Sequence, residues 1–322
     1  MPKLPVQKKD EIGPDERDLI EAINRIEDWR GKNVAYQEVP VGITNPTWCV
    51  SIDSKRYFIK IPGKGTDKFI DRDAVHLANV MASEAGCGPM VIYWFPDTKV
   101  EVFEWLEGYT ACNWRHALNE NVFLGMIDAM KKFHNTQGDL GNPSNAFDQT
   151  WKVIQLTRSG QGLEPYDMER AEWLLHRIED AFYKDGMEMR PCHNDTLVYN
   201  FMYNETTKDG RLVDFEYSSM GDISYDLAVF STDQFYEDPH DMLIIKRYFG
   251  EFDERHFARL KLMKLVADIK WGMWASVQAM SSTLDFDFIR YHGWKFARLR
   301  SHWVDPRIDY WINLLNKKPL FF

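Results

Sequence analysis

Residues 191–226 read PCHNDTLVYNFMYNETTKDGRLVDFEYSSMGDISYD, and this stretch decides the fold. Asp195 lies in a loop, Asn200 lies at the far end of the same loop, and Asp214 follows a short strand. Such a geometry can bring three oxygen ligands to one point, which suits the hard cation Mg²⁺. Phosphoryl transfer requires this set: one carboxylate faces the attacking hydroxyl, while an Asn and an Asp hold metal on the nucleotide phosphates. A single acidic turn residue is usually just solvated, so the prediction depends on the ordered set.

The motif H-N-D-x-x-x-x-N at 193–200, followed by V-D-F-E-Y at 213–217, resembles the choline and ethanolamine kinase family. That family is related to protein kinases and aminoglycoside phosphotransferases. The resemblance implies that Asp195 is the catalytic base, that Asn200 and Asp214 bind Mg²⁺, and that ATP is the phosphoryl donor. Glu216 either faces the metal or supports its ligands.

Two further residues of the stretch are assigned by the same resemblance. Asp226, in the segment YDLA, resembles the aspartate that braces the catalytic loop through backbone hydrogen bonds. His193 invites a catalytic role because histidine titrates near neutral pH. In this family, however, the histidine organises the loop, so both interpretations of His193 stay open.

The segments before the decisive stretch predict a β-rich lobe. A polar tail at 1–14 precedes an expected helix at 15–29, and a second helix is expected at 70–86. Five segments read as strands: VAYQEVP (34–40), TWCVSID (47–53), RYFIKIP (56–62), MVIYWF (90–95) and KVEVFEW (99–105).

The pattern becomes helical after Leu106. Helices are expected at 119–136, 167–184, 239–249, 253–282, 285–301 and 305–316, with short strands only at VYNFMYN and RLVDFEY. The predicted fold is α+β and two-lobed, like a protein kinase. It has a five-stranded antiparallel N-lobe at 1–106 and a mostly helical C-lobe at 107–322.

Lys60 is the main nucleotide-binding candidate. It lies on the third strand, where kinase-like folds place a basic residue against the α- and β-phosphates. Its neighbours are apolar, so its charge needs a partner or an exposed face. Asp73, near the start of the next helix, is the expected partner, at a place where protein kinases have Glu. Arg72 is expected at the surface.

Two backbone segments are further nucleotide-binding candidates. The turn GITNP lies where the family has its phosphate-covering loop, so Gly42, Thr44 and Asn45 are expected to face phosphate oxygens. With one glycine it also reads as an ordinary hairpin turn. VEVFEWLEG (100–108) resembles the strand that leads into the hinge between lobes, whose backbone binds adenine in kinase-like folds. The resemblance implies that the backbone of Glu104, Trp105 and Leu106 binds adenine.

Aromatic residues predict the binding site of the acceptor, the molecule that receives the phosphoryl group. A quaternary ammonium has no N–H to donate, so proteins recognise it with aromatic faces and nearby negative charge. Trp271 and Trp274 are three residues apart on an expected helix and share one face. The family has a similar W-x-x-W, and FDFIRYHGWKF resembles its tyrosine-bearing segment, which points to Tyr291. Tyr236 is a further candidate wall and Asp233 a candidate counter-charge; core packing is the alternative for each aromatic residue.

Composition excludes several other classes of protein. The net charge of −10 argues against a nucleic-acid partner. The four cysteines lack metal-ligand spacing, which fits a reduced, cytoplasmic setting. No apolar run is long enough for a membrane span.

The leading hypothesis is therefore phosphorylation of choline, with ethanolamine as the nearest rival substrate. An aminoglycoside or thiamine kinase would share Asp195, Asn200 and Asp214. Polycationic aminoglycosides would call for several acidic residues in the late helices, and residues 271–284 contain none. A catalytically silent binding module would normally have lost a base or metal residue, and none is missing.

Overall fold

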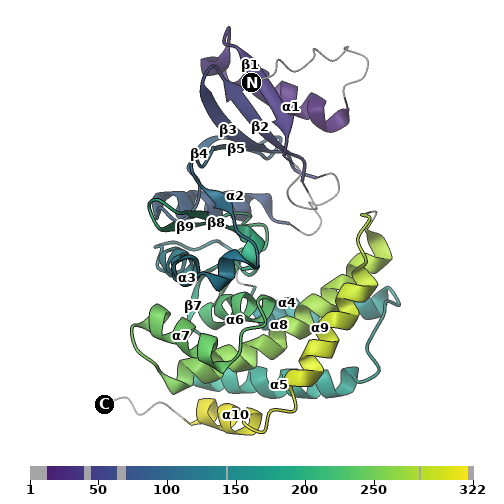
Figure 1. The fold of residues 1–322 in the computed structure, drawn as a ribbon. Coiled ribbons are helices and arrows are strands. Elements are labelled where there is room, and N and C mark those ends of the chain that lie inside the picture. Colours follow the sequence, from purple (N-terminus) through teal and green to yellow (C-terminus); the bar gives the residue numbers. More distant parts are fainter. Residues whose placement is uncertain (1–12, 40–44, 64–69, 143, 283, 318–322) are drawn as a thin grey trace.

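The computed structural model describes residues 13–39, 45–63, 70–142, 144–282 and 284–317. One end of the molecule is an antiparallel sheet with strand order β1-β2-β3-β5-β4 (Figure 1). The strands are β1 (Val34–Glu38), β2 (Thr47–Ile52), β3 (Lys55–Lys60), β4 (Val91–Phe95) and β5 (Val100–Glu104). The predicted five-stranded antiparallel sheet is confirmed.

Helix α1 (Pro14–Arg25) and the short η1 (Glu27–Trp29) cover one face of this sheet. The apolar residues of α1 recur on one stripe, so Leu19 and Ile23 pack with strand residues such as Val50 and Ile59. These side chains form a core of their own, separate from the larger core of the helical lobe. Helix α2 (Arg72–Glu84) is capped at its N-terminus by Asp71, whose side chain accepts from the backbone N–H groups of residues 73 and 74.

The decisive stretch forms two small sheets beneath the first one. Strands β6 (Thr110–Ala111), β8 (Phe201–Asn204) and β9 (Asp209–Leu212) form one, and β7 (Met189–Cys192) pairs with β10 (Ser219–Asp222) in the other. The chain leaves the five-stranded sheet at Glu104 and enters the second sheet at Thr110. The catalytic loop, defined here as residues 193–200, therefore joins two different sheets.

Helices make up the rest of the described chain (Figure 1). They are α3 (Glu120–His134), α4 (Ala146–Ser159), α5 (Met168–Asp185), α6 (Ile223–Asp233), α7 (Asp238–Phe249), α8 (Glu254–Ser281), α9 (Phe288–His302) and α10 (Ile308–Asn316). The sequence did not predict α4 and α6. Helix α6 is buried on nearly every side, so it has no polar face to reveal a helical period. The sequence signal for helix α4 is the capping box that Asn145 and Asp148 form at its start.

Helix α8 is the axis of the helical lobe. It is 28 residues long and packs against α4, α6 and α9. Its residues from 257 to 276 are almost all buried, including several with charged side chains. Arg298 of α9, for example, donates to the buried Asp268 of α8, which ties the two helices together.

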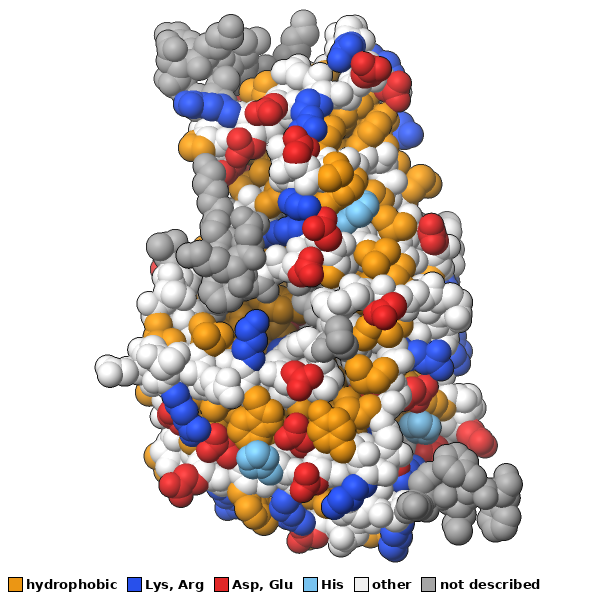
Figure 2. Space-filling view, turned by 180° about the vertical axis from the view of Figure 1, so that it is seen from behind, with side chains coloured by type: hydrophobic (Ala, Val, Ile, Leu, Met, Phe, Trp, Pro, Cys, Tyr) orange, Lys and Arg blue, Asp and Glu red, His pale blue; other side chains and the backbone are white. Residues whose placement is uncertain are grey.

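Two further findings concern membrane insertion and surface charge. No helix of the described chain is both long and apolar enough to cross a bilayer. Figure 2 shows acidic and basic side chains interspersed over one face of the molecule.

Gly272 allows α9 to approach α8. A Cβ at this position would lie 2.6 Å from a ring carbon of Phe296, which is 1% exposed. We expect Gly272→Ala to lower the free energy of unfolding by about 1–3 kcal/mol, because the buried ring must move. Gly293→Ala is the matched control, since a Cβ there meets no atom within 4 Å. Urea unfolding of the two variants measures the difference, and equal stabilities would contradict the close contact.

Candidate active site

Asp226 holds the catalytic loop from behind. Its carboxylate has no exposed surface and accepts three hydrogen bonds: from the backbone N–H groups of His193 and Asn194, each at 2.7 Å, and from His134 Nε2 at 2.9 Å. Burial works against its charge, but His134 leads the groups that lower the pKa of Asp226 below its usual value. The loop is thereby fixed by one internal charge.

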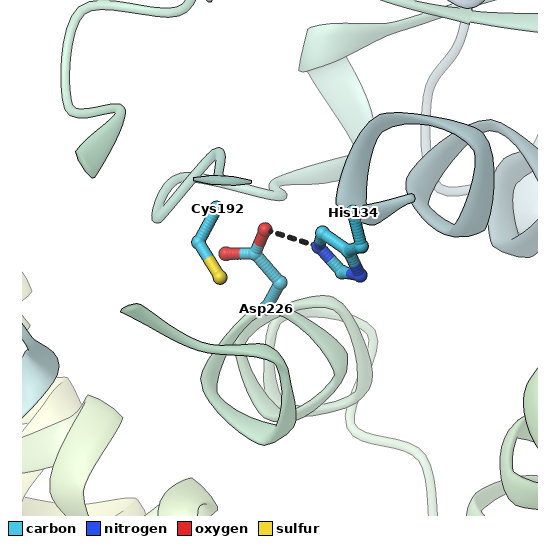
Figure 3. Close-up of side chains that lie close together, drawn as sticks. All are labelled: His134, Cys192 and Asp226. Atoms are coloured by element: carbon cyan, nitrogen blue, oxygen red, sulfur yellow. Dashed lines mark hydrogen bonds and ion pairs between the residues drawn. The ribbon is translucent and has the colours of Figure 1, made fainter. Parts of the chain in front are cut away.

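Cys192 lies next to this contact, as Figure 3 shows. His134, Cys192 and Asp226 place ligand atoms within 4.8 Å of one another, as a metal site would. Each oxygen of Asp226 and both ring nitrogens of His134 are already hydrogen-bonded. Burial also raises the pKa of the Cys192 thiol well above its usual value. The cluster is therefore a structural brace.

His193 positions the loop and has no free atom for proton transfer. It is fully buried. Its Nδ1 accepts from the backbone N–H of Asp195 at 3.3 Å, and Nε2 lies 2.9 Å from the Val213 carbonyl. Nε2 therefore carries the proton and donates it. The predicted catalytic role of His193 is corrected by this geometry, because burial lowers its pKa and both nitrogens are engaged.

Asp195 is oriented by Asn200. The Asn200 amide donates to the Asp195 carbonyl at 2.8 Å and to Asp195 Oδ2 at 3.0 Å. Oδ1 of Asp195 is buried and has no hydrogen-bond partner in the described chain. Burial, followed by the Asp214 carboxylate, raises the pKa of Asp195 to about 7. The carboxylate is thus held in place with one oxygen left for a ligand.

Two motif residues adopt left-handed backbone conformations. Asn194 has φ 63° and Asp214 has φ 69°. Few residues other than glycine adopt this conformation, although Asn and Asp tolerate it best. It costs on the order of 1–3 kcal/mol per residue and is concentrated at functional sites. Here it turns the chain immediately beside Asp195 and after β9.

Lys60 joins the two lobes through carboxylates of the V-D-F-E-Y motif. Its ammonium group contacts Asp214 and lies 3.2 Å from Glu216 Oε1. Burial opposes the charge, but these carboxylates outweigh burial and raise the pKa of Lys60. The predicted Lys60–Asp73 pair is wrong. Asp73 instead lies 2.7 Å from Lys99 at the surface, while its neighbour Arg72 contacts Glu216.

Arg72 and Asn45 complete this charge cluster. The Arg72 guanidinium, which is 8% exposed, donates to Glu216 at 2.8 Å and to Asn45 Oδ1 at 3.0 Å. Asn45 also contacts Glu216 through its amide and accepts from the Gly63 N–H. Burial works against the Glu216 charge, yet Lys60 and Arg72 lower its pKa to about 2. The expectation that Arg72 is a surface residue is wrong, and no signal within α2 separates it from an exposed arginine.

Two of the remaining nucleotide-binding candidates cannot be placed, and the other three lie in the segment around the end of β5. Gly42 and Thr44 lie outside the described residues. The Glu104 N–H donates to the Met90 carbonyl, and the Leu106 carbonyl accepts from the Tyr109 N–H. The Arg56 guanidinium lies over the Trp105 ring. Adenine would therefore have to use other backbone groups of this segment.

The donor set fits Mg²⁺. Asn200 uses its amide nitrogen for Asp195 and Asp214 uses Oδ1 for Lys60. The Asn200 amide oxygen and Asp214 Oδ2 make no hydrogen bond to another described residue. Amide and carboxylate oxygens are ligands that Mg²⁺ takes, so each side chain offers a ligand atom that suits this cation. Glu216 contacts Lys60, Arg72 and Asn45 through the same oxygen, Oε1, and its part in metal binding stays a prediction.

The predicted acceptor aromatics are brought together. The rings of Trp271 and Trp274 are 5.4 Å apart, and those of Trp274 and Tyr291 are 6.3 Å apart, both edge to face. Sequence reasoning missed Tyr217, which lies 5.4 Å from Trp271. It also missed Phe286 and Phe288, which pack against Tyr291 and Trp274 respectively. All three lie inside segments quoted for other residues, where aromatic identity was the available signal.

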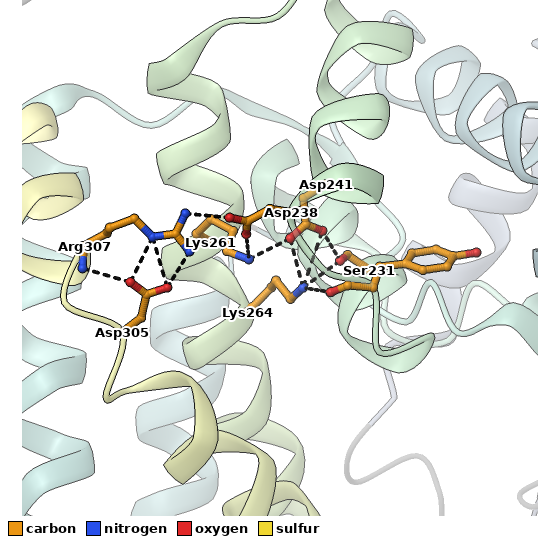
Figure 4. Close-up of polar contacts among 8 residues, drawn as sticks. Ser231, Asp238, Asp241, Lys261, Lys264, Asp305 and Arg307 are labelled. Carbon is orange, nitrogen blue, oxygen red and sulfur yellow. Dashed lines mark hydrogen bonds and ion pairs between the residues drawn. The ribbon is translucent and has the colours of Figure 1, made fainter.

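Tyr236 belongs to the core and is not a wall of this cluster. Its hydroxyl donates to the Ala117 carbonyl at 2.8 Å, and its own carbonyl accepts from Lys264. Figure 4 shows Lys264 in an ion network with Asp241 and Ser231. Asp233 is closer to the site, since its carboxylate accepts from the Val198 N–H at the end of the catalytic loop. The prediction for Tyr236 is therefore corrected.

The family model for choline/ethanolamine kinases matches residues 36–248. The chain belongs to this family. It is 25% identical to "Probable choline kinase 1" of Arabidopsis thaliana over 317 residues, covering 89% of this chain and 90% of that one. It is also 25% identical to "Ethanolamine kinase 1" of Mus musculus over 305 residues, covering 82% of each. The chain is thus a kinase enzyme of a family whose members carry both substrate names.

Solved structures show the same fold. A choline/ethanolamine kinase family protein from Mesorhizobium loti superposes with a TM-score of 0.82 at 20% identity, covering 94% of this chain and 99% of that one. Choline kinase LicA, solved with AMP, gives a TM-score of 0.67 at 17% identity over 88% and 98%. The predicted family and protein-kinase-like fold are confirmed.

The charge cluster between the lobes is tested by Glu216→Gln. This change removes the charge that both Lys60 and Arg72 face, and breaking a buried pair is strongly destabilising, by about 3–5 kcal/mol. We expect the KM for Mg·ATP to rise at least about tenfold while the acceptor KM changes little. Steady-state kinetics at saturating acceptor measures this. Asp73→Asn is the control and should behave as wild type. If Asp73→Asn raises the KM for Mg·ATP more than Glu216→Gln does, Lys60 pairs with Asp73 and not with Glu216.

Proposed function

We propose that this kinase phosphorylates the hydroxyl of choline by in-line attack on the γ-phosphate of Mg·ATP. The observation that carries the choline assignment is the cluster of Trp271, Trp274 and Tyr291 on α8 and α9. Aromatic faces are what a trimethylammonium group requires, because it has no N–H to donate. Asp233, the last residue of α6, supplies a negative charge that acts on Tyr291.

The residues of the chain divide the chemistry as follows. Asp195 receives the hydroxyl proton, and Asn200 keeps its carboxylate in place. Lys60, held by Glu216, binds the α- and β-phosphates. Asn200 and Asp214 would hold Mg²⁺, which would neutralise negative charge on the phosphates. Most of the rate enhancement then comes from positioning and electrostatics, as is usual in phosphoryl transfer.

Ethanolamine is the rival acceptor. Its primary ammonium needs hydrogen-bond acceptors, whereas trimethylammonium needs aromatic faces. Most rings of the cluster belong to tryptophans and phenylalanines, which offer no acceptor to an ammonium group, whereas Tyr217 and Tyr291 each offer one hydroxyl oxygen. This composition favours choline, although one enzyme can accept both.

A single assay tests the assignment. Purified protein with Mg·ATP is scored for ADP release with choline, ethanolamine, thiamine and an aminoglycoside, each over a concentration series. We expect the highest kcat/KM with choline. No choline-stimulated release would remove the substrate assignment, and preferential release with ethanolamine would replace it.

Asp195→Ala tests the base. Loss of general-base catalysis costs about 10²- to 10⁴-fold in kcat, while choline binding, measured by calorimetry, should remain detectable. The thermal unfolding midpoint serves as a check on folding. An Asp195→Ala variant with near-normal turnover would rule out the assigned base.

Trp274→Leu tests the aromatic wall. Loss of one cation–π contact, worth about 0.5–2 kcal/mol, raises the choline KM about 3- to 30-fold. The ATP KM should stay nearly constant. Trp173→Leu is the matched control, because Trp173 is an exposed tryptophan on α5. Equal effects of Trp274→Leu on both KM values would instead indicate a role in core packing.

A further inference from the structure

Lys270 is a buried lysine that has no polar partner. It lies on α8 directly before Trp271 and is 3% exposed, and its Nζ makes no hydrogen bond or ion pair within the described chain. The ammonium lies over three rings, with centroid distances of 4.8 Å to Trp271, 4.9 Å to Tyr225 and 5.9 Å to Tyr217. Aromatic faces attract a cation but do not accept its N–H groups as oxygen does.

The same helix shows how a buried lysine is normally satisfied. Lys264 is 2% exposed, six residues before Lys270, and its ammonium contacts Asp241, Ser231 and the Tyr236 carbonyl. Buried ammonium groups require such partners because loss of water is costly. The described residues therefore supply no oxygen partner for Lys270, and a bound molecule is the candidate partner.

The neighbours of Lys270 indicate the chemistry of that molecule. The Tyr225 hydroxyl and Trp271 Nε1 are also buried and without a hydrogen-bond partner among the described residues. Trp271 Nε1 can only donate, and the Tyr225 hydroxyl can donate as well as accept, so both can donate to an anion. A group with several acceptor oxygens and negative charge suits this environment.

The position of Lys270 indicates which anion this is. Burial lowers the pKa of Lys270 to about 8, and Asp195 is the largest charge acting in the opposite direction. Lys270 in turn is the principal positive charge that acts on Asp195. The buried Oδ1 of Asp195 is unpartnered as well. Lys270 also lies over the ring of Tyr217, three residues after Asp214 in the V-D-F-E-Y motif. It is therefore a cation without a polar partner among the described residues, beside the motif whose Asp214, together with Asp195, is assigned to phosphoryl transfer.

We propose that Lys270 binds the phosphoryl group as it reaches the acceptor hydroxyl, and then holds the phosphate of the phosphorylated product. This inference rests on the proposed function and adds a catalytic residue to it. In the step, the acceptor oxygen forms a bond to the γ-phosphorus, the bond from that phosphorus to the β-bridging oxygen breaks, and ADP leaves. The hydroxyl proton passes to Asp195, and Lys270 stays protonated throughout.

The proposal predicts a split between kinetic constants. An ammonium beside the acceptor pocket repels a cationic acceptor, so its removal should leave the acceptor KM unchanged or lower. It also stabilises the charge of the transferring group, so its removal should lower kcat. A purely structural lysine would not produce this combination.

Lys270→Met is compared with Lys295→Met. Lys295 is the matched control, because it is also a buried lysine over an aromatic ring. It is 5% exposed, and its ammonium lies 4.8 Å from the centroid of the Tyr291 ring. Burial lowers its pKa to about 8 as well, but the charges acting on it are led by Arg298 and Asp268, with Asp195 last. We expect Lys270→Met to lower kcat about 10²- to 10³-fold and to raise the inhibition constant of phosphocholine about tenfold. Lys295→Met should stay within about threefold of wild type in both constants.

Folding is controlled by the thermal unfolding midpoint, with Lys270→Gln as a second variant if the methionine variant is unstable. Wild-type kcat and phosphocholine inhibition in a folded Lys270 variant would overturn the proposal. If the wild type uses ethanolamine or another acceptor, the choline assignment fails, and the same comparison is made with that acceptor and its phosphate ester.

A measurement without turnover separates the two proposals further. Mg·ADP with aluminium fluoride mimics the transferring phosphoryl group, and a bound ligand raises the unfolding midpoint. We expect aluminium fluoride to add to the ADP-dependent shift in the wild type and in Lys295→Met but not in Lys270→Met. An equal added shift in all three proteins would overturn the role of Lys270 whatever the acceptor is.

Discussion

The site depends on one buried carboxylate, that of Asp226. It accepts two backbone hydrogen bonds from the catalytic loop and one from His134, and it has no exposed surface. An isolated charge in this position would be very costly, so the loop must adopt the one conformation that supplies these donors. The left-handed backbone of Asn194 is a consequence, because its N–H and side chain must point in prescribed directions. The loop backbone thereby positions Asp195, and the Asn200 amide then orients its carboxylate through Oδ2.

A second charge cluster connects the lobes. Lys60 comes from the sheet, Arg72 from α2, and Asp214 and Glu216 from the motif after β9. Because the carboxylates are shared between cations from different elements, the nucleotide side and the catalytic loop are positioned relative to each other by the same contacts. Buried pairs of this kind contribute little net stability. Their effect is to fix geometry, and the phosphates of a nucleotide would enter a site already arranged by charge.

The acceptor side is built differently, from aromatic rings on α8 and α9. The close approach of these helices depends on Gly272, which leaves room for Phe296. The cluster combines rings suited to a cation with Lys270, a cation of the chain itself. These opposed features make sense if they serve the two ends of one molecule, the ammonium of the acceptor and the phosphate that it gains.

The family, the five strands of the first lobe and most of the helices could be predicted from the sequence, because they depend on motifs and on local spacing and period. Asp226 braces the loop as predicted, and the roles of Asp195, Asn200 and Asp214 stay predictions. Prediction from the sequence failed where partners are distant along the chain. Lys60 was assigned to the nearby Asp73, and only the folded chain brings Glu216 to it. The burial of Arg72 and Lys270 was likewise decided by tertiary structure. A charged helix residue usually faces water, and only packing of other elements around it creates the buried environment that demands a partner.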